Sequence, residues 1–168
     1  MSRATDRTKN LRALLAEHEA GAPDVLIADL TLDSRKVRLG AAFVALPGAR
    51  THGVAFVEQA VQAGAGAILW EPAPGVAPPA APRGVCVVRV PDLTRKLGHI
   101  ADRFFDEPSA AVRVIGVTGT NGKTTTAHVI AAALERLGEA SAYAGTLGYG
   151  RIDALRAGAF TTPDCITV

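Results

Sequence analysis

The chain has 168 residues, of which 48% are hydrophobic and 20% are charged, a composition typical of a globular protein and not of a disordered one. A formal net charge of +2 gives no basic surface for nucleic acid or an anionic membrane, and no apolar run reaches the ~18–20 residues of a membrane span. Its two cysteines, Cys86 and Cys165, lie far apart and predict no disulfide framework. Residues 1–10 are polar with no apolar segment behind them, so no secretory signal is predicted. The cysteine pattern favours the reducing cytoplasm. We expect a monomer without nucleic-acid or membrane partners.

The first hundred residues alternate between helical and strand-like patterns. Leu11, Leu14 and Leu15 share one stripe with charges opposite, which predicts an amphipathic helix over residues 7–20. Five prolines in residues 71–83 predict a surface loop, because proline cannot pair inside a sheet. The other segments are predicted as strands at 25–32, 41–46, 67–70 and 85–90, and as helices at 53–63 and 92–105.

A domain boundary is predicted at residues 106–109, where Pro108 ends the preceding helix. This divides the chain into domains of residues 1–107 and 108–168. About 60 residues bury too little surface for a comfortable parallel-sheet domain, so the second piece is interpreted as the opening of a larger domain. The alternative is a small complete domain. Its predicted elements are a strand at 112–117, a glycine-rich loop at 118–122, a helix at 123–137 and a strand at 140–144.

A phosphate-binding loop is predicted where the second domain's first strand meets its helix. Gly119 and Gly122 permit the tight turn that brings N–H groups close to phosphate oxygens, and the positive end of the helix dipole follows. Lys123 can reach the outer phosphates, and Thr124 supplies a hydroxyl for Mg²⁺. The predicted ATP-binding residues are Gly119, Thr120, Asn121, Gly122, Lys123, Thr124 and Thr125.

This loop departs from the common G-x-x-x-x-G-K-[ST] pattern. That pattern places a glycine five residues before Gly122, where this chain has Val117. The alternative interpretation is a glycine-rich turn before an ordinary helix, with Lys123 in solvent. The strand–loop–helix context favours nucleotide binding.

The loop sequence T-G-T-N-G-K-T-T resembles the nucleotide loop of the Mur ligases and of folylpolyglutamate synthetase. The N-terminal half resembles the first domain of the Mur ligases that add the third peptide residue or the terminal dipeptide, a domain that folylpolyglutamate synthetase lacks. The residues that carry this resemblance are Leu32-Asp33-Ser34-Arg35-Lys36-Val37, Gly40, Phe43-Val44-Ala45-Leu46-Pro47-Gly48, Gly53 and Phe56. Two later motifs are similar to the Mur ligases that add the third peptide residue, and differ from those that add the terminal dipeptide. These motifs are Gly145-Thr146-Leu147-Gly148 and Thr161-Thr162-Pro163-Asp164.

The resemblance implies an α/β fold in which a small N-terminal substrate domain precedes the start of a parallel-sheet ATPase domain of the P-loop type. It implies a ligase that uses ATP and Mg²⁺ to join a diamino acid to UDP-N-acetylmuramoyl-dipeptide in peptidoglycan synthesis. ATP phosphorylates the substrate carboxylate, and the amino group then displaces phosphate from the acyl phosphate. Lys123 is the implied catalytic residue and Thr124 the implied metal ligand, because phosphoryl transfer depends on positioning and charge stabilisation.

The same resemblance assigns the substrate's uridine diphosphate to the first domain. The residues alone leave two alternative interpretations open: Ser34 lies in an ordinary turn after a strand, and the Arg50 side chain is simply solvated. Thr161 and Thr162 match a pair that holds the muramoyl-peptide part of the substrate in the family. The residues alone also predict an N-cap there, before a helix that begins at Pro163. The predicted substrate-binding residues are Leu32, Ser34, Ala49, Arg50, Thr51, Thr161 and Thr162.

Several functional positions of the family find no counterpart in these residues. They include a further magnesium-binding carboxylate, a carbamylated lysine, the adenine contacts and a third domain that binds the incoming amino acid. We therefore expect a piece of a longer ligase that is inactive by itself, and the choice between meso-diaminopimelate and L-lysine stays open. Two alternatives also stay open: a UDP-sugar- or nucleotide-binding module without ligase activity, and a Mur ligase that adds the terminal dipeptide.

Overall fold

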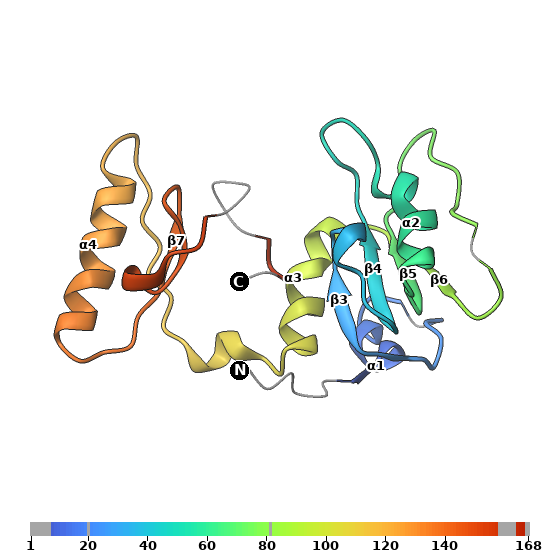
Figure 1. Ribbon diagram of the computed structural model, residues 1–168, viewed down its shortest axis with the longest axis horizontal. Helices are drawn as coiled ribbons and strands as arrows, with labels where there is room; N and C mark the ends of the chain where they lie inside the picture. Colours follow the sequence, from blue (N-terminus) through green and yellow to red (C-terminus); the bar gives the residue numbers. More distant parts are fainter. Residues whose placement is uncertain (1–7, 20, 81, 158–163, 167–168) are drawn as a thin grey trace. The chain divides into compact units, whose positions relative to one another are not determined.

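The computed structural model describes residues 8–19, 21–80, 82–157 and 164–166 (Figure 1). Contacts divide the chain into two compact units, Met1–Pro108 and Ser109–Val168, which are called unit 1 and unit 2 below. Among the described residues, no helix is both long enough and apolar enough to cross a lipid bilayer.

Unit 1 is built on a four-stranded parallel sheet in which the strands follow one another in chain order. Every residue of the two central strands is buried, as a parallel sheet covered on both faces requires. This sheet confirms the predicted mixed α/β fold. Its strands are β3 (Asp29–Thr31), β4 (Ala41–Ala45), β5 (Ala67–Trp70) and β6 (Cys86–Arg89).

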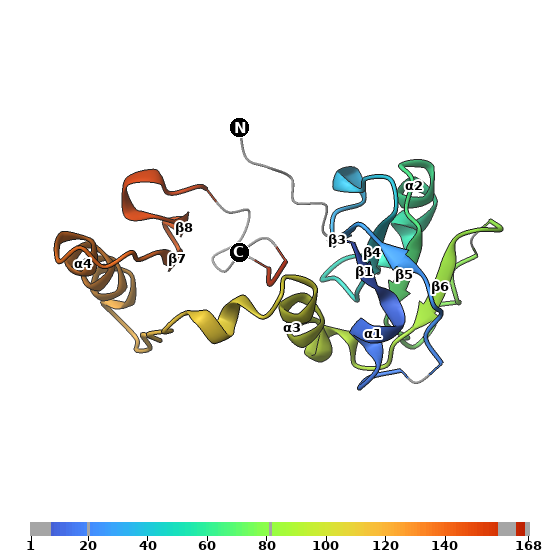
Figure 2. The ribbon, with the colours of Figure 1, turned by 90° about the horizontal axis from the view of Figure 1, so that it is seen from below.

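Helices cover both faces of this sheet (Figures 1 and 2). On one face, the short 3₁₀ helix η2 (Gly53–Phe56) leads into α2 (Val57–Gln62). On the other face lie α1 (Leu11–Leu15) and α3 (Leu93–Phe104). A second 3₁₀ helix, η1 (Ser34–Lys36), follows the end of β3 and packs against α2.

The core of unit 1 therefore has two layers, because side chains alternate between the faces along each strand. The α2 layer includes Phe43, Ile68 and Trp70 from the strands and Val57 and Ala60 from the helix. The opposite layer is formed by the buried side chains of the other two helices. These are Leu11, Leu14, Leu15, Leu93, Leu97, Ile100, Ala101 and Phe104, and they include the predicted leucine stripe.

The strand predicted at 25–32 is divided at Ala28. On one side, β2 (Leu26–Ile27) pairs antiparallel with β1 (Lys9–Asn10), and on the other, β3 pairs parallel with β4. The Ala28 N–H donates to the Gly40 carbonyl at 2.9 Å. The neighbouring strand therefore changes from β1 to β4 at this residue, and the hydrophobic pattern of residues 25–32 does not predict that change.

The helix predicted over 7–20 is confined to the five residues of α1. Its start is fixed because Lys9–Asn10 pairs with β2, and because the Asn10 side chain accepts a hydrogen bond from the Ala13 N–H. The predicted stripe is correct, but the helix that carries it is shorter than the pattern suggests.

Unit 2 contains one long helix, α4 (Lys123–Arg136), and an antiparallel hairpin of β7 (Tyr143–Gly145) and β8 (Gly148–Gly150). The helix agrees with the one predicted at 123–137. The strand predicted at 140–144 lies slightly later, as β7, and its hairpin partner was not predicted. Two short 3₁₀ helices, η3 (Pro108–Ala111) and η4 (Ile152–Ala154), complete the described elements.

The strand predicted at 112–117 is wrong for the described structure. Residues 113–118 have no regular secondary structure, and Val114 and Ile115 are 80% and 54% exposed. A strand forms only where a neighbour completes its backbone hydrogen bonds. Among the described residues of unit 2, β7 and β8 pair with one another and leave this apolar segment without such a neighbour.

We expect the substitution Leu69→Ala to destabilise unit 1 by about 2–5 kcal/mol, because it opens a cavity in a fully buried strand. The matched substitution Leu26→Ala, at a leucine that is 64% exposed, should change the free energy of unfolding by less than about 0.5 kcal/mol. Urea unfolding followed by Trp70 fluorescence measures both changes. Equal losses of stability would contradict the assignment of the core.

Candidate functional site

The loop before α4 has the backbone conformation that a phosphate-binding turn needs. Gly119 has a φ of +146° and Gly122 a φ of +78°, both in the region that residues with a side chain rarely adopt. Gly122 is the N-cap of α4 and has no side chain with which to cap the helix. The first N–H groups of a helix have no partner within it, so this end of α4 can receive an anion.

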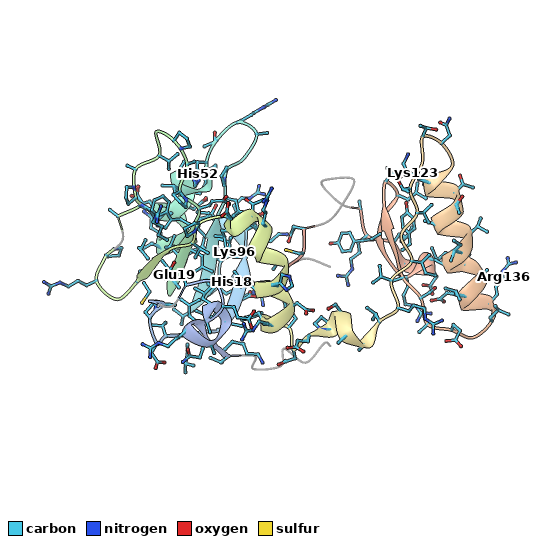
Figure 3. The ribbon with its side chains drawn as sticks, turned by 180° about the vertical axis from the view of Figure 1, so that it is seen from behind. His18, Glu19, His52, Lys96, Lys123 and Arg136 are labelled. Carbon is cyan, nitrogen blue, oxygen red and sulfur yellow. The ribbon has the colours of Figure 1, made fainter. Side chains whose placement is uncertain are left out.

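Lys123 folds back over this loop. Its Nζ donates to the Gly119 carbonyl and, at 3.2 Å, to the Thr120 carbonyl. The ammonium group therefore lies beside the loop backbone, and Figure 3 shows it at the end of α4 opposite Arg136. Of the seven predicted ATP-binding residues, Thr124 is half-buried and the other six are exposed.

Thr124 meets a residue that the sequence did not single out as a site residue. Its Oγ1 lies 2.7 Å from the Oγ1 of Thr146, in the turn between β7 and β8. The residue types fit a magnesium–nucleotide: Mg²⁺ commonly takes one or two protein oxygens and completes its shell with water and phosphate oxygens. Thr124 offers such an oxygen beside the loop. Among the described residues, no group of three or more His, Cys, Asp or Glu side chains could hold a metal.

The hairpin that carries Thr146 is fastened along the length of α4. The Tyr143 ring, 4% exposed, packs edge-on against His128 with the ring centres 6.1 Å apart. Further along the helix, Ser141 Oγ donates to the Ala131 carbonyl at 2.8 Å. Near the helix end, Arg151 Nη2 donates to Glu135 Oε2 at 2.8 Å. These contacts fix the turn of the hairpin beside the first turn of α4.

Glycines allow the hairpin to turn so tightly. A Cβ at Gly145 would collide with the Tyr143 phenol group, and a Cβ at Gly148 would collide with the Arg156 carbonyl. Gly148 also has a φ of +120°. The motif Gly145-Thr146-Leu147-Gly148 therefore has a steric explanation, and its glycines were the signal that could have predicted the turn.

In unit 1, the turn after β3 is stabilised by its own aspartate. Asp33 Oδ1 accepts from the Arg35 backbone N–H at 3.0 Å and from Arg35 Nε at 2.9 Å, while Oδ2 accepts from Nη2 at 2.9 Å. These hydrogen bonds from Arg35 hold the pKa of the Asp33 carboxyl below its ordinary value. Asp33 therefore stabilises the turn through its hydrogen bonds to Arg35.

Ser34 is buried beneath this turn. Its Oγ donates to Gln59 Oε1 at 2.6 Å, which ties the turn to α2. Leu32, just before the turn, is half-buried. The hydrogen bond between Ser34 and Gln59 joins residues 25 positions apart and had no signal in the sequence.

The loop after β4 presents Ala49, Arg50 and Thr51 at the surface. His52 fixes its end: Nδ1 accepts from the Val54 N–H at 3.1 Å, which leaves Nε2 to donate to the Glu71 carbonyl at 2.9 Å. Figure 3 labels this histidine. The loop is thereby attached to the end of β5.

The two predicted substrate segments of unit 1 follow neighbouring parallel strands. The turn at 32–35 follows β3 and the loop at 49–51 follows β4, so both lie at the carboxyl edge of the sheet. This edge is where ligands bind in open α/β sheets. Thr161 and Thr162 lie outside the described residues.

Two protein-family models together match most of this chain. The model described as "Mur ligase family, catalytic domain" matches residues 26–105, and the one described as "Mur ligase middle domain" matches residues 117–168. The chain belongs to the Mur ligase family. The glycine-rich loop at residues 119–122 thus lies in the part that matches the middle domain, and the four-stranded sheet of unit 1 lies in the part that matches the catalytic domain.

Individual Mur ligases agree with this membership. The UDP-N-acetylmuramoyl-L-alanyl-D-glutamate–2,6-diaminopimelate ligase of Alkalilimnicola ehrlichii is 48% identical over 153 residues, covering 88% of this chain and 31% of the relative. The ligase of the same name from Ectopseudomonas mendocina is 48% identical over 158 residues, covering 94% of this chain and 31% of its own length. The chain thus spans about a third of these relatives.

Solved structures of Mur ligases are also similar to this chain. A UDP-N-acetylmuramoyl-L-alanyl-D-glutamate–2,6-diaminopimelate ligase matches with a TM-score of 0.67 and 29% identity over 95% of this chain and 32% of that one. The D-alanyl-D-alanyl-adding Mur ligase from Acinetobacter baumannii matches with a TM-score of 0.56 and 28% identity over 83% of this chain and 29% of that one.

The turn at Asp33 should show its ion pair in a pH titration. Because the folded pKa of Asp33 lies below the unfolded value, the ion pair stabilises unit 1 above the ordinary aspartate pKa, and this contribution is lost as pH falls through the folded pKa. We expect Arg35→Ala to return the Asp33 pKa toward its ordinary value, measured by NMR of the carboxyl carbon. Arg38→Ala, at another exposed arginine, is the control and should leave it unchanged.

Proposed function

We propose that the protein carrying this chain is an ATP-dependent ligase that joins 2,6-diaminopimelate to UDP-N-acetylmuramoyl-L-alanyl-D-glutamate in the cytoplasm. The observation that carries the proposal is the phosphate loop: its two glycines have positive φ and its lysine lies over the loop backbone. The names of the sequence relatives support diaminopimelate, a choice that the sequence alone left open. The same names favour the tripeptide-forming activity over the dipeptide-adding one.

Unit 2 would bind ATP through residues 119–125. The N–H groups of the loop and of the first turn of α4 would receive the phosphates. Lys123 would exchange its carbonyl partners in the loop for phosphate oxygens and stabilise the charge that develops during transfer. Thr124 would hold Mg²⁺ through Oγ1, and that ion, when bound, would neutralise charge on the outer phosphates.

Unit 1 would bind the uridine diphosphate at the carboxyl edge of its sheet, beside Leu32, Ser34 and residues 49–51. Arg50 is exposed on a loop with fixed ends, and its guanidinium suits a diphosphate that is held and never cleaved. The Ser34 hydroxyl already donates its proton to Gln59. Ser34 would therefore bind the substrate through its backbone, or through its hydroxyl once the hydrogen bond to Gln59 is broken. The assignment of Thr161 and Thr162 to the muramoyl-peptide part is supported by the family resemblance.

Lys123→Ala in the full-length protein should lower the turnover number by about 10²–10³-fold, the usual cost of removing one preorganised charge-stabilising donor. The side chain is exposed, so the unfolding temperature should change little. Arg136→Ala removes a cation from the other end of α4 and is the matched control. Wild-type turnover in the Lys123 variant would refute a role for this loop in phosphoryl transfer.

UDP and ATP should perturb different units of the 168-residue chain. In an amide NMR titration, we expect UDP to shift Ser34, Arg50 and Thr51, and ATP to shift residues 119–125. Arg50→Ala should weaken UDP binding by about tenfold, because a hydrogen bond to a charged group contributes at least about 1.5 kcal/mol.

Arg83→Ala removes an exposed arginine just before β6, at the amino edge of the same sheet, and should leave UDP binding unchanged. Saturation with UDP without any shift at Ser34 or Arg50 would refute the assignment of unit 1.

A further inference from the structure

The contact between the hydroxyls of Thr124 and Thr146 restricts where each hydroxyl proton can point. The two oxygens lie 2.7 Å apart, so one hydroxyl donates and the other accepts. A threonine hydroxyl has one proton and two lone pairs. If Thr124 directs a lone pair to a cation, its proton must point elsewhere, and the Thr146 oxygen is an acceptor within hydrogen-bond distance.

Thr146 is well placed to serve as that acceptor. It lies in a turn flanked by two sterically required glycines, on a hairpin fastened to α4 through Tyr143, Ser141 and Arg151. Its own hydroxyl is exposed and can turn its proton to solvent. The backbone that carries this acceptor is therefore fixed beside α4, and rotation about a single side-chain bond, χ1 of a β-branched residue, places its oxygen.

We propose that Thr146 is a positioning residue, whose oxygen accepts the Thr124 hydroxyl proton and thereby keeps a Thr124 lone pair directed at the magnesium–nucleotide. This inference rests on the proposed function, because it presupposes that the loop binds a magnesium–nucleotide. Groups that orient a metal ligand commonly change metal affinity by about 10–100-fold when removed. Thr146 should accordingly affect Mg²⁺ dependence and leave metal-free nucleotide binding unchanged.

The test measures ADP binding to the full-length protein by calorimetry, in EDTA and over a series of Mg²⁺ concentrations. For Thr146→Val, we expect the Kd for ADP in EDTA to stay within about twofold of wild type. The Mg²⁺ concentration that gives half of the metal-dependent tightening should rise about tenfold. Thr146→Ser restores the oxygen and should return this concentration to within about twofold of wild type.

Two further variants separate positioning from general damage. Thr126→Val removes an exposed hydroxyl from the same helical turn of α4 and should behave like wild type. Thr124→Val should abolish the metal-dependent tightening, and the double variant with Thr146→Val should be no worse than Thr124→Val alone, because Thr146 acts through Thr124. If Thr146→Val does not fold, Thr146→Ala takes its place in every comparison.

A Thr146→Val protein with wild-type Mg²⁺ dependence would overturn the inference, as would an equal loss of ADP affinity with and without Mg²⁺. A raised KM for the muramoyl substrate with unchanged Mg²⁺ dependence would make Thr146 a substrate contact and would also overturn it. In these cases the proposed function stands, provided that the wild-type protein binds ADP more tightly with Mg²⁺. A wild-type protein that binds no ADP under either condition would overturn both.

Discussion

Parallel strands must be covered on both faces of their sheet, and this requirement shapes unit 1. In this unit α2 covers one face, and α1 and α3 cover the other (Figure 2). The loops at the ends of the strands are therefore the parts of the sheet that a ligand can reach. At the carboxyl edge, Glu71 links a loop to a helix: its carbonyl accepts from His52, and its carboxylate accepts from the N–H and hydroxyl of Thr94 in the first turn of α3. These hydrogen bonds attach the end of the loop at 49–51 and the start of α3 to the end of β5, while Arg50 remains exposed.

In unit 2, the corresponding constraint is the attachment of a hairpin along one helix. Contacts from the hairpin and its flanking residues reach α4 at Thr124, His128, Ala131 and Glu135, from the first turn to near the last. Such a series fixes both the rotation and the register of the hairpin against the helix. The turn between β7 and β8 therefore lies at a fixed position beside the glycine-rich loop. The loop itself bends at Gly119 and Gly122, whose positive φ angles glycine adopts most readily.

Under the proposed function, the two units would have two different tasks. Unit 1 would hold a diphosphate without cleaving it, through N–H groups, hydroxyls and Arg50 at the strand ends. Unit 2 would stabilise a phosphoryl group in transfer through the N-terminus of α4 and Lys123. This division of labour is consistent with the two Mur ligase models matching the two parts of the chain separately.

The sequence by itself determined the alternation of strands and helices, the leucine stripe of α1, the glycine-rich loop before α4 and the family, because each depends on residues close together in the chain. Only the tertiary structure decided which segments pair. It divided a predicted strand at Ala28, left residues 113–118 without a strand partner, and joined Ser34 to Gln59 and Thr124 to Thr146 across 25 and 22 positions. Local pattern specifies how a segment buries its apolar face, whereas the partner that completes its hydrogen bonds is set by packing between segments distant in the chain.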